Sequence, residues 1–86
     1  MHTVEMLEQA LETAERLGYK IRQEYLGGSG GSACEFGGQK WLFVDLALNQ
    51  IEQLDQVTEA LKGDPAIHVI DIPESVQKLL DLPEAA

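Results

Sequence analysis

Two adjacent glycines, Gly37 and Gly38, separate two short apolar runs and limit how this part of the chain can fold. The tightest β-hairpins have a two-residue loop with positive φ at both positions, which glycine adopts without steric cost. We therefore predict a hairpin whose strands run from Ala33 to Phe36 and from Lys40 to Ala47.

The second of these strands is apolar on both sides. Trp41 and Phe43 alternate with Leu42 and Val44, and successive side chains of a strand point to opposite faces. A strand with two apolar faces belongs in the interior of a sheet, so this strand is predicted to be central.

Two other segments have the spacing of amphipathic helices, with an apolar residue every three or four positions. The apolar rows are Val4, Leu7, Leu11, Ala14 and Leu17, and Ile51, Leu54, Val57 and Leu61. Thr3 suits the N-cap of the first helix, and Gly18 suits the left-handed position that ends it. Asn49 and Glu52 form a capping box at the start of the second helix.

The remaining elements are shorter. Alternation over residues 19–25 predicts a strand, and the β-branched run Ile67 to Ile72 predicts a fourth. Pro73 opens a short third helix, and residues 83–86 are expected to fray. The order is α-β-β-β-α-β-α in one domain, residues 1–86. We expect an α+β fold with a small, mostly antiparallel sheet of about four strands, and with the first two helices on the same face.

The charge and composition exclude several classes of partner. The formal net charge is −9, from 15 acidic and 6 basic residues, and the basic residues are scattered. Affinity for nucleic acids and anionic membranes comes largely from clustered Lys and Arg, so neither partner is expected. A basic protein partner would fit the charge. One cysteine, no signal-peptide pattern and no long apolar run predict a cytoplasmic protein.

Three residues are candidates for catalysis. Cys34 is the only nucleophilic thiol, His68 the only internal histidine, and Asp45, or alternatively Asp71, an acid that could orient it. Because Cys34 shares strand parity with Phe36, we expect its side chain to be buried. Asp45 is expected at a strand end, accepting hydrogen bonds from loop amides. No metal-ligand spacing and no cofactor motif is present, so neither a metal nor a cofactor is expected.

The candidate contact residues come from the glycine-rich segment and the apolar strand. They are Gly28, Gly30, Gly31, Trp41 and Phe43. Since two helices cover only one sheet face well, the other face favours association, and a homodimer is expected. Its interface would include Trp41 or Phe43, or the C-terminal helix around Leu79 and Leu80.

The segment from Gly27 to Leu54 also resembles known proteins. Its Gly-Gly-Ser-Gly-Gly-Ser-Ala-Cys run, hairpin and Trp-Leu-Phe-Val-Asp strand resemble a group of small uncharacterised bacterial proteins, which implies a shared fold and a bacterial origin but no activity. The strand and following helix are also similar to zinc metallopeptidases of the phage-immunity-regulator type. Residues 56–61 lack the His-Glu-x-x-His of that family, so the resemblance implies neither zinc nor peptidase activity.

Two functional hypotheses follow. The first is a non-enzymatic protein-interaction or regulatory module. The alternative is a small cysteine-dependent enzyme or thiol sensor that uses Cys34 with His68.

Overall fold

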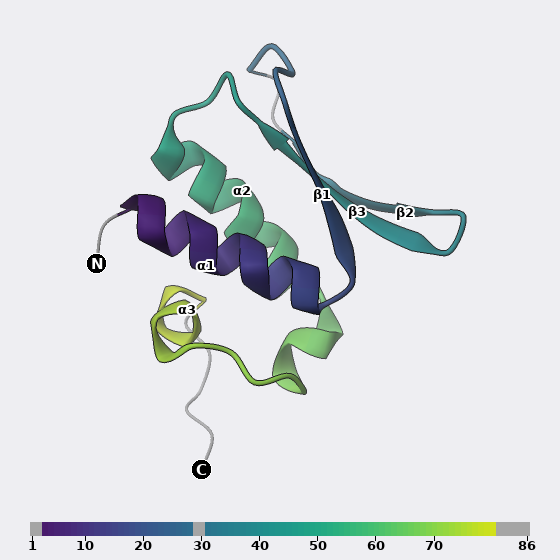
Figure 1. Cartoon of the computed structure of the whole chain (residues 1–86), viewed down its shortest axis with the longest axis vertical. Helices are drawn as coiled ribbons and strands as arrows, with labels where there is room; N and C mark the ends of the chain where they lie inside the picture. Colours follow the sequence, from purple (N-terminus) through teal and green to yellow (C-terminus); the bar gives the residue numbers. More distant parts are fainter. Residues whose placement is uncertain (1–2, 29–30, 81–86) are drawn as a thin grey trace.

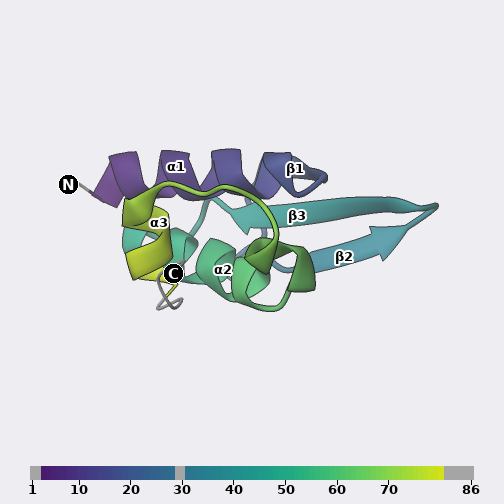
Figure 2. The same ribbon diagram turned by 90° about the horizontal axis from the view of Figure 1, so that it is seen from below.

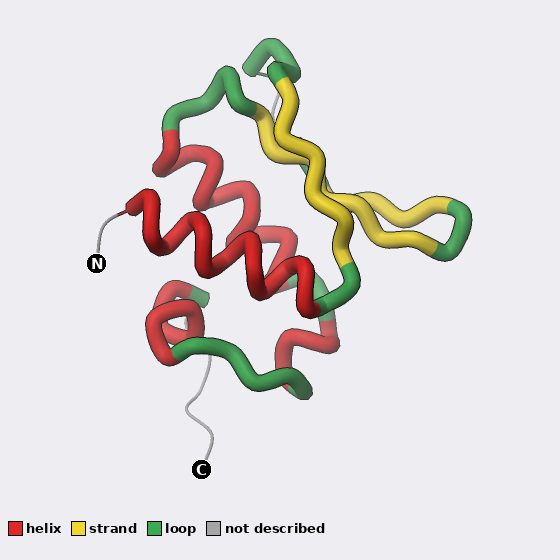
Figure 3. The backbone as a smooth tube through the Cα atoms, in the orientation of Figure 1, coloured by secondary structure: helices red, strands yellow, loops and turns green. Residues whose placement is uncertain are grey.

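In the computed structural model, three helices lie on one side of a three-stranded mixed sheet (Figure 1). The structure describes residues 3–28 and 31–80. Figure 3 shows the same path with helices, strands and loops distinguished. The elements are α1 (Thr3–Arg16), β1 (Tyr19–Glu24), β2 (Ala33–Phe36), β3 (Gln39–Asp45), α2 (Gln50–Lys62), the 3-10 helix η1 (Pro65–His68) and α3 (Glu74–Leu79).

Helix α1 is amphipathic, as the sequence predicts. Leu7, Ala10 and Ala14 are buried against the core, and the glutamates of the helix are exposed. Val4 was expected in the buried row but is exposed, because the buried face of α1 is centred on Ala10 and Ala14, to one side of Val4. Gly18 ends the turn after α1 with a φ of 98°, the left-handed conformation predicted for it.

The predicted hairpin is confirmed, but its second strand runs from Gln39 to Asp45 and not from Lys40 to Ala47. Gly37 and Gly38 have φ values of 62° and 76°, and Phe36 lies opposite Gln39 in the antiparallel pair of β2 and β3. Positive φ at both positions gives the turn whose twist matches that of its strands. The hairpin extends past the ends of α1 and α2, so β2 is exposed along its whole length (Figure 2).

Strand β3 is central, also as predicted. The strand order is β1-β3-β2, with β1 parallel and β2 antiparallel to β3. Leu42 and Val44 are completely buried beneath the helices, whereas Trp41 and Phe43 on the opposite face are only partly buried.

The predicted fourth strand, Ile67 to Ile72, is wrong, and so is the prediction of a mostly antiparallel sheet. Asp64 caps η1 through its carboxylate, which accepts a hydrogen bond from the Ala66 amide at 2.9 Å. Ile67 is 1% exposed and Val69 is 81% exposed, so burial does not alternate with a period of two. A proline after a capping residue favours a helical turn, and here it overrides the β-branched composition.

Helix α2 begins at the predicted capping box. The Glu52 amide donates to the Asn49 side chain at 2.9 Å, and the Glu52 carboxylate accepts from the Asn49 amide at 3.2 Å. Leu54, Val57 and Leu61 join the core, as predicted, while Ile51 is exposed.

The core lies between the helices and one face of the sheet. Val76 of α3 and the adjacent Leu80 are buried in it, so α3 packs beside α1 as part of the helical layer (Figure 2). Among the described residues, no helix is long and apolar enough to cross a membrane.

Candidate interaction surface

The face of the sheet away from the helices carries aromatic and basic side chains from all three strands. We call this side the open face, because in the described part of the chain no helix lies over it (Figure 1). Residues paired across neighbouring strands point to the same face. The pairings Lys20 with Trp41, Arg22 with Phe43, and Cys34 with Trp41 therefore place these five residues on the open face.

Three rings form a continuous row on the open face. Phe36 and Trp41 have centroids 6.3 Å apart with an angle of 19° between their planes, and Trp41 and Phe43 are 6.3 Å apart at 21°. Phe36 is 67% exposed, and the other two rings are partly exposed. We call Phe36, Trp41 and Phe43 the aromatic row.

Basic groups border the aromatic row. The Lys20 ammonium lies 5.6 Å from the Trp41 ring centroid, within the range of a cation–π interaction. Arg22 forms an exposed ion pair with Glu24 at 3.3 Å. Glu35 pairs with Lys40 in the register, so it lies on the opposite face from the aromatic row. Two of the six basic residues of this acidic chain therefore lie on the open face.

Gly31 and Ser32, which precede β2, pack closely on β3. A Cβ atom at Gly31 would lie 1.6 Å from the carbonyl oxygen of Phe43, so the backbone can approach this closely only with glycine there. The Phe43 amide donates to the Ser32 carbonyl at 3.1 Å. Gly28 lies in an open turn with a φ of 79°, and Gly30 lies outside the described residues. The predicted contact residue Gly31 thus has a structural role beside the aromatic row.

Asp45 is fully buried and organises the loops at one end of the sheet. Its carboxylate accepts hydrogen bonds from the Leu26 and Ala47 amides, both at 2.9 Å. The Asp45 amide lies 3.4 Å from the side-chain oxygen of Gln56 on α2. The predicted position at a strand end, with loop amides as donors, is confirmed.

Cys34 is exposed, and the prediction that it is buried is wrong. It does share a face with Phe36, but that face is the open one. His68 ends η1, which packs against α2 on the other side of the sheet. Asp45 lies four residues along β3 from Trp41, the partner of Cys34, which corresponds to about 13 Å. The structure therefore does not bring the three catalytic candidates together.

A polar cluster on the helical side was not predicted. The Tyr19 hydroxyl donates to the Asp64 carboxylate at 3.0 Å, and the Lys40 ammonium donates to the same oxygen at 2.6 Å. Lys40 also lies 4.8 Å from the centroid of the Tyr19 ring. Tyr19 and Asp64 are 45 positions apart, and no local pattern in the sequence links them. Through Asp64, the cluster connects the segment that follows α2 to strands β1 and β3.

The protonation of this cluster follows from its surroundings. Burial, then the hydrogen bond to Asp64 and the charges of Asp64 and Glu35, raise the pKa of Tyr19 to about 12. Burial alone would raise the pKa of Asp64, but hydrogen bonds from Lys40, the Ala66 amide and Tyr19 outweigh it and lower that pKa below 3.8. Tyr19 is therefore neutral and Asp64 ionised at neutral pH, which suits a structural ion pair.

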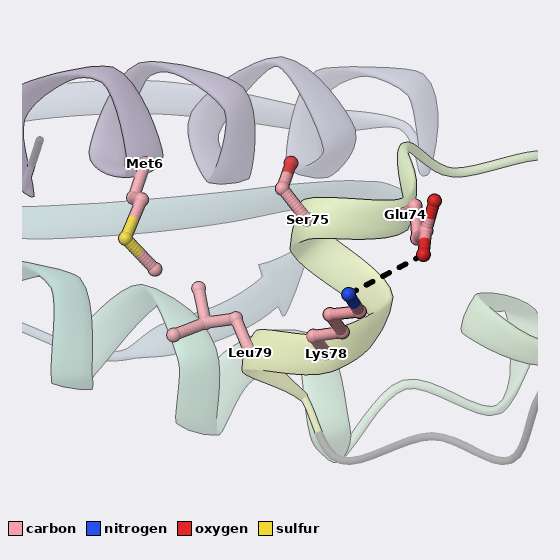
Figure 4. A pocket seen from close by; sticks show the side chains of 5 residues that line it. All are labelled: Met6, Glu74, Ser75, Lys78 and Leu79. Atoms are coloured by element: carbon pink, nitrogen blue, oxygen red, sulfur yellow. Dashed lines mark ion pairs between the residues drawn. The ribbon is translucent and has the colours of Figure 1, made fainter. Parts of the chain in front are cut away.

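An open pocket lies between α1 and α3. It is lined by Met6, Glu74, Ser75, Lys78 and Leu79 (Figure 4). Lys78 pairs with Glu74 at 3.4 Å, and the Ser75 hydroxyl donates to the Gln9 side chain. Glu74, Ser75 and Lys78 therefore already have interaction partners within the protein, which is typical of a groove between helices.

The described residues contain no group of three His, Cys, Asp or Glu side chains that could hold a metal ion. In comparisons with protein-family models, curated proteins and solved structures, none matched this chain. The two resemblances noted for the segment from Gly27 to Leu54 therefore stay predictions, and no residue role is taken from them.

Proposed function

We propose that this chain is a non-enzymatic protein-interaction module that acts as a homodimer through the exposed part of its sheet, which comprises the open face and the β2 edge beside it. The observation that supports the proposal is the aromatic row on the open face. Tryptophan and other aromatic side chains are enriched at the energetic centres of protein interfaces. The sequence suggests Trp41 or Phe43, or the C-terminal helix around Leu79 and Leu80, for the interface. Of these surfaces, the open face also carries the exposed Phe36, which lies on the edge strand β2.

Burial of the aromatic row on association would contribute a large free energy relative to the stability of so small a domain. An aromatic side chain buries about 150–250 Å² when covered, and burial of apolar surface contributes roughly 25 cal/mol per Å². Covering the exposed part of Phe36 alone would therefore contribute roughly 3 kcal/mol. A domain of this size has a total stability of only about 5–15 kcal/mol, so association would stabilise the fold appreciably.

The alternative function, a cysteine-dependent enzyme or thiol sensor, has less support. Catalytic thiols are activated by a nearby base or cation, and Cys34 has neither His68 nor Asp45 beside it. The exposure of Cys34 makes its thiol accessible to crosslinking reagents.

A second copy suits this surface better than a strongly basic partner does. Lys20 lies on the open face and would repel additional positive charge, and Arg22 is already paired with Glu24 there. Other acidic residues that would attract a basic protein lie on other surfaces, including a row of exposed glutamates along α1. That row is Glu5, Glu8, Glu12 and Glu15. A basic partner therefore stays a prediction for the helical side.

The proposal is tested with two single variants of exposed apolar residues. Phe36→Ser removes the most exposed ring of the aromatic row, and Val69→Ser is the matched control on the segment after η1. We expect Phe36→Ser to weaken dimerisation at least tenfold in sedimentation velocity, and Val69→Ser to leave it unchanged. Circular dichroism checks that both variants fold. Equal dimerisation of the two variants would contradict the proposed surface.

A further inference from the structure

Among the strands that the structure describes, none pairs with the outer edge of β2, and this edge offers backbone hydrogen-bonding groups at defined positions. Phe36 and Gln39 flank a two-residue turn, which makes them a hydrogen-bonded pair, and the Phe43 amide bonds the Ser32 carbonyl. Such pairs alternate with non-hydrogen-bonded pairs along antiparallel strands. Cys34 therefore directs its backbone groups toward β3, whereas Ala33 and Glu35 direct theirs toward the outer edge.

We propose that two copies of the chain pair β2 with β2 in antiparallel orientation about a twofold axis, with Cys34 opposite the partner's Cys34. This inference rests on the proposed function, and it names the surface through which the homodimer forms. It joins the two sheets into one of six strands and places the two aromatic rows on the same continuous face.

The charge of the strand selects this register. Within β2, three twofold registers pair the outward-pointing groups of Ala33 and Glu35: Ala33 with Glu35, Ala33 with Ala33, or Glu35 with Glu35. The last sets two carboxylates directly opposite each other, which is destabilising. The Ala33–Ala33 register uses Gly31, which is already packed on Phe43, and leaves Phe36 beyond the pairing. The Ala33–Glu35 register uses Ser32 to Phe36 and avoids both problems.

Pairing at the edge is also favoured over packing the two open faces together. Face packing would bury Lys20 and the Arg22–Glu24 ion pair of both copies in one interface, with repulsion between the lysines and a desolvation cost for all these charges. Edge pairing leaves these cations in water. The β2–β3 hairpin extends beyond the helices, so a second copy can approach β2 without meeting α1 or α2 (Figure 2).

The register is tested by disulfide crosslinking of the folded protein. In the proposed pairing, Cys34 and its counterpart form a non-hydrogen-bonded pair with Cα atoms about 4.5 Å apart, within the range that a disulfide spans. The oxidant is diamide, which accepts two electrons and two protons as two thiols become one disulfide. We expect rapid formation of the covalent dimer, at a rate that is independent of dilution while the protein stays dimeric.

Two double variants provide the matched control. In a Cys34→Ser background, Ala33→Cys and Glu35→Cys are each prepared alone. Because residue 33 lies opposite residue 35 of the partner, the mixture should crosslink at least tenfold faster than either variant by itself. Faster crosslinking of Ala33→Cys alone, or of Glu35→Cys alone, would identify one of the other registers and overturn the proposal.

A backbone variant gives a second readout. The Glu35 amide points to the outer edge, so Glu35→Pro removes a donor of the proposed pairing but none of the pairing with β3. We expect a loss of dimer of at least tenfold, with Glu35→Ala as a control that keeps the dimer. A dimer in sedimentation with no preferred Cys34 crosslink would refute the register and leave the proposed function standing. A monomeric protein would refute both.

Discussion

At the scale of single residues, Gly31 and Asp45 hold loop backbone in place beside the sheet. Gly31 allows the glycine-rich segment to lie against the Phe43 carbonyl, and Asp45 holds the Leu26 and Ala47 amides. Both lie beside the aromatic row. The open face therefore depends on a loop that is packed in place at its end, and the loop is not simply a spacer between strands.

The first residue-scale prediction concerns Gly31→Ala. The added Cβ would fall 1.6 Å from the Phe43 carbonyl oxygen, so the backbone of β3 or of the loop must move. We expect a loss of about 2–3 kcal/mol in the free energy of unfolding, measured by urea denaturation. Gly28→Ala, which meets no atom but has positive φ, should cost about 1–2 kcal/mol. Equal costs would show that the close contact at Gly31 is not present in solution.

Residue patterns predicted the parts of the fold that local chemistry decides. The hairpin at Gly37 and Gly38 and the capping box at Asn49 follow from turn and cap geometry, and both are present. The orientation of Cys34 could not be predicted in this way. Alternation shows which side chains share a face, but only tertiary packing decides which face the helices cover.

At the scale of elements, the end of α2 and the start of η1 are fixed to the sheet by Tyr19, Lys40 and Asp64. The sequence did not reveal this link, because its members come from three separate elements. The segment from Ile67 to Ile72 shows a related limit. β-Branched composition favours a strand. The cap at Asp64 and the proline after it instead start the helical turn η1, and Ile67 within this turn is buried in the core.

The element-scale prediction is a dependence of stability on pH. The pKa of Asp64 is lowered below 3.8 in the folded protein, so its contribution is complete above that pH and is lost as the pH falls through the folded pKa. Asp64→Asn should cost about 2 kcal/mol at pH 7 and progressively less below about pH 4. Urea denaturation at several pH values measures this difference, and Asp55→Asn, an exposed site on α2, is the control.

The same cluster predicts a loss of stability in alkali. Folding raises the pKa of Tyr19 from 10.0 to about 12, so the neutral phenol stabilises the fold fully below pH 10, and this contribution is lost between pH 10 and 12. Tyr19→Phe should remove that part of the pH dependence. An unchanged alkaline profile in Tyr19→Phe would contradict the assignment.

At the scale of the whole molecule, the net charge and the open face favour different classes of partner. The chain carries a net charge of −9, whereas its aromatic row lies beside Lys20 and Arg22. Aromatic rings near basic residues are also used to stack bases. We expect the net charge to dominate, with no binding of single-stranded DNA or RNA tighter than about 10 μM at 0.15 M salt. Fluorescence anisotropy measures this, and tighter binding would assign the open face to nucleic acid.

The strand order could not be predicted from the sequence either. The parallel pairing of β1 with β3, and with it the position of β2 at an edge, depends on contacts between residues about twenty positions apart. These contacts decide that β1 and β2, and not β3, lie at the edges of the sheet. The sequence could suggest a homodimer from the apolar faces of β3, but the surface itself follows from the topology.

Sedimentation equilibrium of the unmodified chain at low to high micromolar concentrations tests the central claim most directly. Because the proposed strand pairing is short, the dimer is expected to dissociate in the micromolar range. The account predicts an average mass that rises with concentration from 9.5 kDa toward about twice that value. A mass that stays at 9.5 kDa up to several hundred micromolar would contradict the homodimer, and with it the proposed function.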